Sequence, residues 1–171
     1  GLRDRNSARL ALQESEFRWK YALEGAGDGV WDWNRQTGAV FFSRRWREML
    51  GFGDDEIVTG SEWESRIHPE DRERVLDASS RLLAGLIPTY VMEYRLQAKD
   101  ASWRWIFSRG MVVSTDAQGR ATRIIGTHAD MTERKLREES LNRAERMHAV
   151  QALVQSEQRF RQLADAMPQI V

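Results

Sequence analysis

The sequence of 171 residues contains no cysteine, so disulfide bonds, thiolate metal sites and cysteine nucleophiles are excluded. It also has no apolar run near the roughly 20 residues that span a bilayer. The N-terminus lacks the charged-then-apolar pattern of a secretion signal. We therefore expect a fragment without membrane contact that resides in the cytoplasm, from a full-length protein that is either cytoplasmic or membrane-tethered.

An excess of charge of one sign is also missing, because 26 basic residues balance 26 acidic ones. No overall field therefore favours nucleic acid as a partner. Catalytic patterns are absent as well: there is no Gly-x-Ser-x-Gly elbow, no phosphate loop and no pair of histidines at metal-ligand spacing. We expect no metal site and no enzymatic activity in this fragment.

The composition that is present suits one domain with appendages, since 41% of the residues are hydrophobic. Residues 1–24 contain good helix formers, with apolar side chains at Leu10, Phe17 and Tyr21, and predict an amphipathic helix. A glycine-rich cluster at residues 25–29 ends this helix, because glycine accepts the backbone angles of a helix stop.

Strand-like alternation follows the glycine cluster and predicts a hairpin in which Trp31 and Trp33 share one face. Turn signals separate three later strand candidates, a pattern typical of antiparallel neighbours. The predicted elements are a hairpin at residues 30–42, short helices at 43–51 and within 52–66, a helix from Pro69 to about Leu83, and strands at 90–98, 103–115 and 121–129. Both faces of these strands carry apolar residues, so we expect the short helices to cover one face and the N-terminal helix or a partner subunit to cover the other.

A resemblance to a known family lies where the strands pass into a long charged helical pattern. Residues 130–132, Asp-Met-Thr, followed by Glu-Arg-Lys, resemble the terminal Asp-Ile-Thr signature of PAS sensor domains, the PAC-type motif. Residues 29–34, 46–52 and 67–71 resemble the first strand, the first short helix and the start of the main helix of that family, in the same order. The resemblance covers roughly residues 25–135 and implies an α+β fold, with about five antiparallel strands, short helices on one face, and flanking helices at both ends.

A second similarity is internal, because residues 152–171 align without a gap on residues 11–30, with an offset of 141. Two charged helices can look alike by chance, and that alternative stays open. We interpret the match as the start of a second PAS-like domain, which ends as its first strand begins. The expected organisation is an N-terminal helix at 1–24, a PAS sensor domain at 25–132, a linker helix at 133–155 and a truncated second repeat at 156–171.

The resemblance implies that the chain is a signal-sensing or signal-relay module from a multi-domain bacterial protein with tandem PAS domains. It would couple a ligand or partner to a downstream histidine kinase, or to a cyclic-dinucleotide cyclase or phosphodiesterase, through its C-terminal helix. The alternatives are a ligand-free dimerisation or spacer module and a non-covalent flavin redox sensor. The expected partners are a second copy bound through the flanking helices, a neighbouring PAS domain and the output domain.

Asp130 and Thr132 are the residues that we expect to couple the sheet to this helix. Asp130 can accept hydrogen bonds from the start of the helix and Thr132 can cap it, so that strand position and helix direction become linked. The alternative is a plain helix cap without a signalling role.

The expected ligand pocket involves Trp46 and Trp63, since the short helices line the cavity in this family, and His128 on the last strand. The alternative roles are packing and an ordinary hydrogen bond, which we favour for Trp31, Trp33, Trp103 and Trp105; we expect His68 to cap a helix.

Without cysteine, the cysteine–flavin photoadduct of light-sensing relatives is excluded. Haem is not expected, because haem-binding relatives place the iron ligand on the long helix, and residues 69–83 contain no histidine. A non-covalent flavin or another small molecule remains open.

Overall fold

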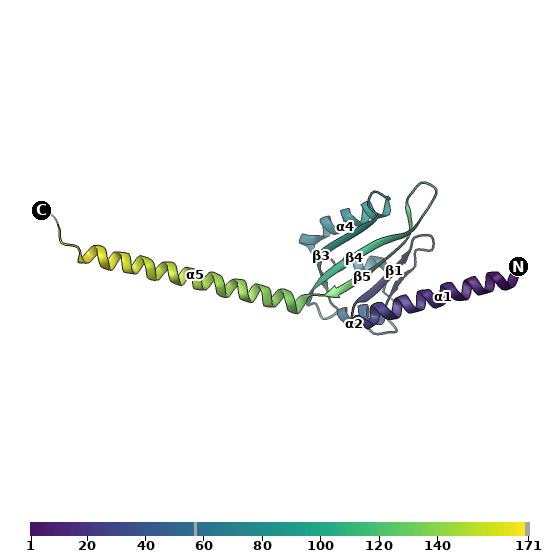
Figure 1. Ribbon diagram of the computed structural model, residues 1–171, viewed down its shortest axis with the longest axis horizontal. Helices are drawn as coiled ribbons and strands as arrows, with labels where there is room; N and C mark the ends of the chain where they lie inside the picture. Colours follow the sequence, from purple (N-terminus) through teal and green to yellow (C-terminus); the bar gives the residue numbers. More distant parts are fainter. Residues whose placement is uncertain (57, 170–171) are drawn as a thin grey trace. The chain divides into compact units, whose positions relative to one another are not determined.

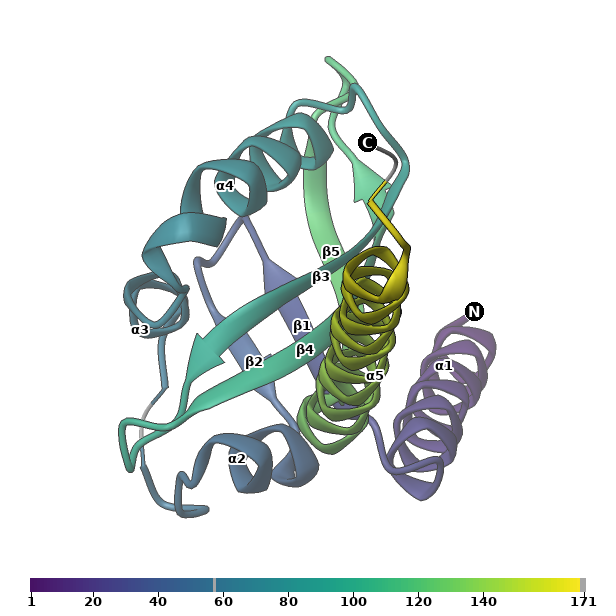
Figure 2. The same cartoon turned by 90° about the vertical axis from the view of Figure 1, so that its left-hand side faces the viewer.

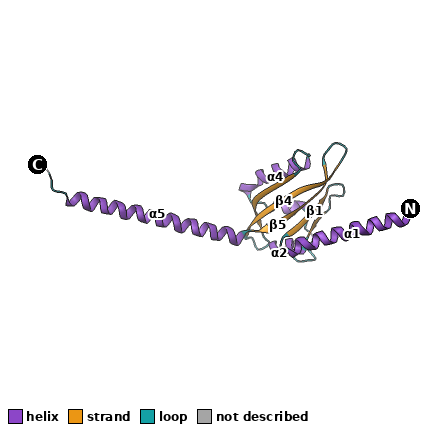
Figure 3. Ribbon diagram, in the orientation of Figure 1, coloured by secondary structure: helices purple, strands orange, loops and turns teal. Residues whose placement is uncertain are grey.

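The computed structural model of the chain describes residues 1–56 and 58–169, without the side chains of residues 16–21, 23 and 24. Residues 1–132 form one unit and residues 133–171 another. The strands of the first unit are β1 (Gly29–Asn34), β2 (Val40–Phe42), β3 (Thr89–Gln97), β4 (Trp103–Thr115) and β5 (Ala121–Asp130). The helices are α1 (Leu2–Gly25), α2 (Arg44–Leu50), α3 (Gly60–Ser65), α4 (Pro69–Leu83) and α5 (Thr132–Ala166) (Figure 1, Figure 3). The predicted α+β fold, an antiparallel sheet with flanking helices, is confirmed.

The five strands form one antiparallel sheet in the order β2-β1-β5-β4-β3. The last strand in the sequence therefore occupies the centre, where it pairs with β1 on one side and β4 on the other. The predicted hairpin and the predicted neighbours β3, β4 and β5 are all present. The pairing of β1 with β5 joins the β1–β2 hairpin to the other three strands in one sheet.

One face of the sheet is covered by α2, α3 and α4, which gather on the same side (Figure 2). Helix α2 contributes Trp46 and Leu50 to the core, and α4 contributes Val75 and Leu82. All four side chains are buried, which supplies most of the free energy that holds the helices to the sheet.

Trp31 lies flat across the middle of this face because two facing glycines leave room for its indole ring. Trp31 pairs with Gly126 of β5, which in turn pairs with Gly110 of β4. A Cβ atom at Gly126 would lie 2.5 Å from Cε2 of Trp31, and one at Gly110 would lie 3.2 Å from its Cη2. The glycines therefore set the depth at which the indole packs.

Helix α4 begins as the sequence predicts, with Pro69 in its first turn and His68 as the N-cap. His68 Nδ1 accepts a hydrogen bond of 3.1 Å from the backbone N–H of Glu70. The predicted capping role of His68 is confirmed, and its ring also packs against Trp103 at 4.5 Å between centroids.

The opposite face of the sheet carries exposed apolar side chains, among them Val91, Met111 and Val113. The described side chains of α1, residues 2–15, are themselves exposed. This part of α1 therefore does not cover the sheet. Phe17 and Tyr21, which the predicted amphipathic pattern includes, lie outside the described side chains.

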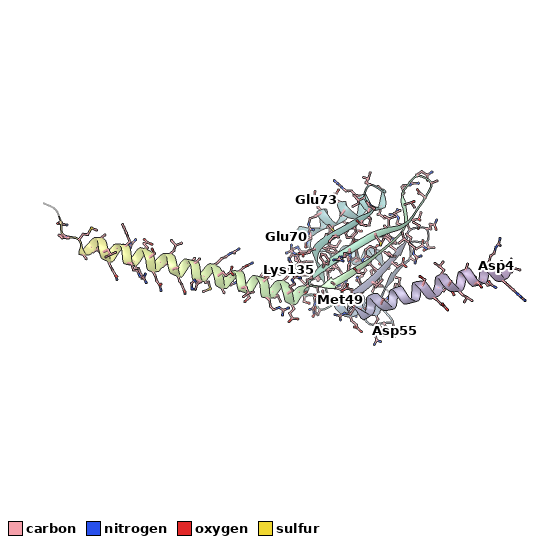
Figure 4. All side chains as sticks on the ribbon, in the orientation of Figure 1. Asp4, Met49, Asp55, Glu70, Glu73 and Lys135 are labelled. Atoms are coloured by element: carbon pink, nitrogen blue, oxygen red, sulfur yellow. The ribbon has the colours of Figure 1, made fainter. Side chains whose placement is uncertain are left out.

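Helix α5 continues without interruption from Thr132 to Ala166. Every side chain from residue 136 to 169 is exposed (Figure 4), including those of Leu141, Met147 and Phe160. Neither α5 nor any other helix in the described part of the chain is long and apolar enough to cross a membrane.

Candidate functional site

A buried hydrogen-bond network connects the sheet to two helices on its covered face. Trp46 of α2 donates from Nε1 to Nδ1 of His128 on β5, at 2.8 Å. Nε2 of His128 lies 3.1 Å from the hydroxyl of Tyr94 on β3, and Trp63 of α3 donates from Nε1 to the same hydroxyl at 3.1 Å. The structure thus brings Trp46, Trp63 and His128 together through Tyr94, which sequence reasoning missed.

The chemistry of the partners fixes the tautomer of His128. An indole N–H can only donate, so Nδ1 of His128 must be the acceptor and Nε2 carries the proton. His128 is 2% exposed, and this burial lowers its pKa to about 3. The ring is therefore neutral at physiological pH and donates from Nε2 to Tyr94.

The network continues along the covered face through a second tyrosine. Ser108 on β4 lies 3.1 Å from the Tyr90 hydroxyl and also interacts with the Tyr94 hydroxyl. Burial raises the pKa of Tyr90 to about 12 and raises that of Tyr94 as well, so both phenols keep their protons. Tyr90 and Tyr94 are four residues apart on one strand, and this even spacing is a sequence signal that could have placed them on the same face.

A cavity of about 50 Å³ lies between the sheet and helices α3 and α4. Its walls are mostly apolar, and no charged side chain among the described residues lines it. The lining residues are Trp31, Trp33, Val40, Phe42, Gly60, Trp63, Ser79, Leu82, Leu83, Tyr90, Ile124 and His128. Trp63 and His128 therefore reach the cavity wall, whereas Trp46 lies behind it.

Trp31 and Trp33 combine packing with a place on this wall. The indole N–H of Trp31 is buried without a hydrogen-bond acceptor among the described residues. Residues 1–56 and 58–169 also hold no cluster of His, Asp and Glu that could bind a metal ion. The polar groups of the cavity are thus neutral hydrogen-bonding groups.

The end of β5 is tied to the first turn of α5 and to β4 by short hydrogen bonds. Asp130 Oδ1 accepts from the backbone N–H of Thr132 at 2.9 Å and from its hydroxyl at 2.5 Å. The Thr132 hydroxyl in turn accepts from the backbone N–H of Trp105 at 2.9 Å, and the N–H of Met131 donates to the Trp105 carbonyl at 2.7 Å. Asp130 thus receives hydrogen bonds from the helix start, as expected, while Thr132 faces the neighbouring strand rather than capping its own helix.

A partly buried ion pair connects helix α4 to the same region of the sheet. Burial alone would raise the pKa of Asp71, but hydrogen bonds from the side chain and backbone of Arg95 outweigh it and hold the pKa below its usual value. The Arg95 guanidinium makes bonds of 2.9 and 3.0 Å to the carboxylate and lies 5.0 Å from the Trp105 ring centroid. Asp71 of α4, Arg95 of β3 and the Trp105 ring of β4 thus lie in one continuous series of contacts.

Comparison with known proteins adds independent information on this arrangement. The model of a protein family described as the PAS fold matches residues 39–128. A crystal structure of a sensory box histidine kinase/response regulator from Burkholderia thailandensis is 36% identical, with a TM-score of 0.64, and the match covers 78% of this chain and 98% of that one. The N-terminal domain of a diguanylate cyclase with PAS/PAC sensor from Marinobacter aquaeolei is 25% identical, with a TM-score of 0.55, over 63% of this chain and 98% of that one.

Two curated relatives are also similar over most of this chain. The non-motile and phage-resistance protein of Caulobacter vibrioides is 30% identical over 134 residues, which are 77% of this chain and 16% of the relative. The sensor protein FixL of Bradyrhizobium diazoefficiens is 30% identical over 127 residues, which are 74% of this chain and 25% of the relative. The chain thus spans a quarter or less of the length of these two proteins.

Proposed function

Because the chain belongs to the PAS family, we propose that it senses or relays a signal, coupling the occupancy of its cavity to a downstream output domain through α5. The observation that carries this proposal is the position of two residues on the central strand. His128 lies on the cavity wall, and Asp130, two residues later, holds the first turn of α5. A change at one end of this short segment therefore acts directly on the other.

The mechanism is a shift between two arrangements of β5 and the helix start. A ligand that binds one arrangement more tightly than the other increases its population, and the ratio of the two affinities limits the response. The hydrogen bonds of Asp130 and Thr132 supply the connection, because they join β4, β5 and α5 within a few residues. In this proposal the chain binds and relays, and catalysis belongs to the output domain.

The output domain would be a histidine kinase, or a diguanylate cyclase or phosphodiesterase. The names of the relatives support this choice, since one solved relative is a histidine kinase and another is a diguanylate cyclase with a PAS/PAC sensor. A cytoplasmic location is part of the same proposal.

A neighbouring PAS domain is part of the same proposal. Helix α1 ends at Gly25 and α5 ends at Ala166, so the two helices stop at positions separated by the repeat offset of 141. This agreement supports the interpretation that α5 combines a linker helix with the first helix of a second repeat. The predicted strand start of that repeat, at residue 171, lies outside the described residues.

A ligand-free dimerisation or spacer module is the second candidate. It is favoured by the exposed apolar residues of α5, among them Leu136, Leu141 and Val150, which could form a seam with a second copy. The small cavity also favours it. The same volume, about 50 Å³, argues against a non-covalent flavin, which needs a pocket several times larger.

Native mass spectrometry of the purified chain, compared with the same sample after denaturation, tests these candidates. Extra mass that is lost on denaturation would support the sensing proposal and give the mass of the ligand. A dimer without extra mass would favour the spacer, because subunit contact without a ligand is what that candidate requires. A bare monomer would count against the seam along α5.

A further inference from the structure

The buried network contains more hydrogen-bond donors than it can use internally. It consists of six neutral side chains, and each of them carries one N–H or O–H proton. These side chains are Trp46, Trp63, His128, Tyr94, Ser108 and Tyr90. Four hydrogen bonds and the interaction of Ser108 with Tyr94 join them, so at least one proton has no acceptor within the network.

The two indole groups determine the direction of these hydrogen bonds, because an indole N–H can only donate. Trp46 donates to His128, which then donates to Tyr94, and Trp63 donates to the same phenol oxygen. The oxygen of Tyr94 therefore receives two N–H donors, which fill its lone pairs, and its own proton must point to another acceptor. The Ser108 hydroxyl is the neighbour that can accept it.

The surplus proton consequently falls on the last pair, Ser108 and Tyr90. Their single contact of 3.1 Å uses one of their two protons. Ser108 is fully buried and lies away from the cavity, whereas Tyr90 is part of the cavity wall. A bound molecule can therefore reach the surplus proton only at the Tyr90 hydroxyl.

The remaining walls restrict the occupant further. No charged side chain among the described lining residues could compensate an ion, so a charged molecule would lose its hydration without replacement. The buried N–H of Trp31, another wall residue, also lacks an acceptor in the described structure, so the local excess is of donors. A volume of about 50 Å³ admits a molecule on the order of four non-hydrogen atoms.

We propose that the cavity binds a small uncharged molecule with a hydrogen-bond acceptor, such as a carbonyl or ether oxygen, which accepts a hydrogen bond from Tyr90. This inference rests on the proposed function, in which the cavity is the sensing site. It deepens that function by naming the chemical class of the ligand and the donor that recognises it. Binding completes the hydrogen bonds of a network that includes His128 on the central strand.

The test uses two probes of nearly the same shape, acetone and 2-methylpropene, of which only acetone has an acceptor oxygen. Each is titrated into the 171-residue chain, and binding is followed by the ¹⁵N–¹H signals of the tryptophan indoles that line the cavity. The comparison is made in the wild type, in Tyr90→Phe and in Val91→Ala. Val91 is a matched control because it is the next residue of β3 and is 63% exposed on the opposite face.

We expect Tyr90→Phe to reduce the affinity for acetone relative to 2-methylpropene by about fivefold, because one neutral hydrogen bond is lost. Val91→Ala should leave the ratio of the two affinities unchanged. Well-dispersed indole signals show that each variant is folded, so a loss of binding cannot be confused with unfolding.

Two results would overturn the inference, and they differ in whether the proposed sensing function is also contradicted. If both probes bind and Tyr90→Phe does not change the ratio, Tyr90 is not the donor, while the cavity remains a binding site. If neither probe shifts the cavity indoles up to its solubility limit, the cavity does not admit such molecules, and the proposed sensing function loses its site as well.

Discussion

His128 carries no charge at neutral pH because its ring lies buried between Trp46 and Tyr94, and burial lowers its pKa to about 3. In the unfolded chain the pKa of histidine is about 6.5. Between these values the unfolded chain binds more protons than the folded one, so the free energy of unfolding rises with pH. The stability that comes from neutral His128 is therefore fully present above pH 6.5 and is lost as the pH falls toward 3.

The first prediction follows from this difference in pKa. Between pH 7 and pH 5.5, the wild type should lose about 1 kcal/mol more of its free energy of unfolding than His128→Gln, which cannot titrate. Urea unfolding at both pH values measures this difference. His68 and His148 are present in both proteins, so their contributions to the difference in pH dependence cancel. Equal pH slopes in the two proteins would mean that His128 is protonated in the folded state.

Gly126 leads to the second prediction. A Cβ atom at this position would overlap the Trp31 indole and the backbone oxygen of Arg109, so Gly126→Ala should lower the free energy of unfolding by about 3 kcal/mol. Gly53→Ala is the control, because its new Cβ would meet Glu56 at an ordinary 3.5 Å and should change stability by less than about 0.5 kcal/mol. Similar stabilities of the two variants would show that the sheet adjusts and that Trp31 is not held by the glycines.

At the scale of elements, the joint between β5 and α5 is the contact on which the proposed coupling depends. Asp130 and Thr132 join three segments, because their hydrogen bonds reach the backbone of Trp105 on β4 as well as the first turn of α5. The Arg95 guanidinium lies over the Trp105 ring and pairs with Asp71 of α4. Trp105 of β4 is thus linked to α4 through Arg95 and to the start of α5 through Thr132.

The third prediction concerns this joint. Asp130→Ala should destabilise the first turn of α5 by about 1 kcal/mol, the usual cost of a lost capping carboxylate. Amide hydrogen exchange at residues 132–135 should accelerate about fivefold, with little change in the exchange of the sheet. Glu138→Ala is the control, since it removes only an exposed ion pair with Arg134.

The same variant also tests coupling in the full-length protein. If Asp130→Ala accelerates local exchange but leaves the output activity and its ligand response normal, Asp130 is a helix cap without a signalling role. Unchanged exchange at residues 132–135 would contradict the capping contact itself.

At the scale of the whole molecule, the sheet domain does not depend on α5 for its core. The core residues all belong to residues 1–132, whereas the described side chains of α5 beyond residue 135 are exposed. Burial of apolar surface is the main favourable term in folding, so α5 contributes little to the stability of the sheet domain.

The fourth prediction follows from this separation. A chain that ends at residue 135 should fold with a melting temperature within about 2 °C of that of the 171-residue chain. Thermal unfolding followed by near-UV circular dichroism measures this, because the buried tryptophans report on the core. A larger decrease that depends on protein concentration would instead show that α5 stabilises the domain through a second copy.

Most of the elements could be predicted from the sequence because their signals are local. Alternation placed Trp31 and Trp33 on one face, and Pro69 marked the start of α4. The pairing of β1 with β5 could not be predicted from alternation, because its register depends on the fit of the Trp31 indole over Gly126.

The candidate site could be predicted only in part, for a similar reason. His128 and Trp63 lie on the cavity wall, but Tyr94, which joins them, belongs to a strand that carries no motif of its own. The contact of Thr132 with Trp105 is also invisible in the sequence, since it depends on two strands that meet only in the folded sheet.

The central position of β5 has a further consequence during synthesis of the chain. Gly29 of β1 pairs with His128, so the ribosome must add about 100 residues before this pairing can form, on the order of 5–20 s. A two-stranded hairpin is at best marginally stable alone, so β1 and β2 emerge with Trp31 and Phe42 uncovered. The sheet closes only when β5 enters between β1 and β4, a non-local step of the kind that makes folding slow. The nascent chain therefore passes through a long interval in which it needs protection from aggregation, and helix α5 is made only after the strand that completes the sheet.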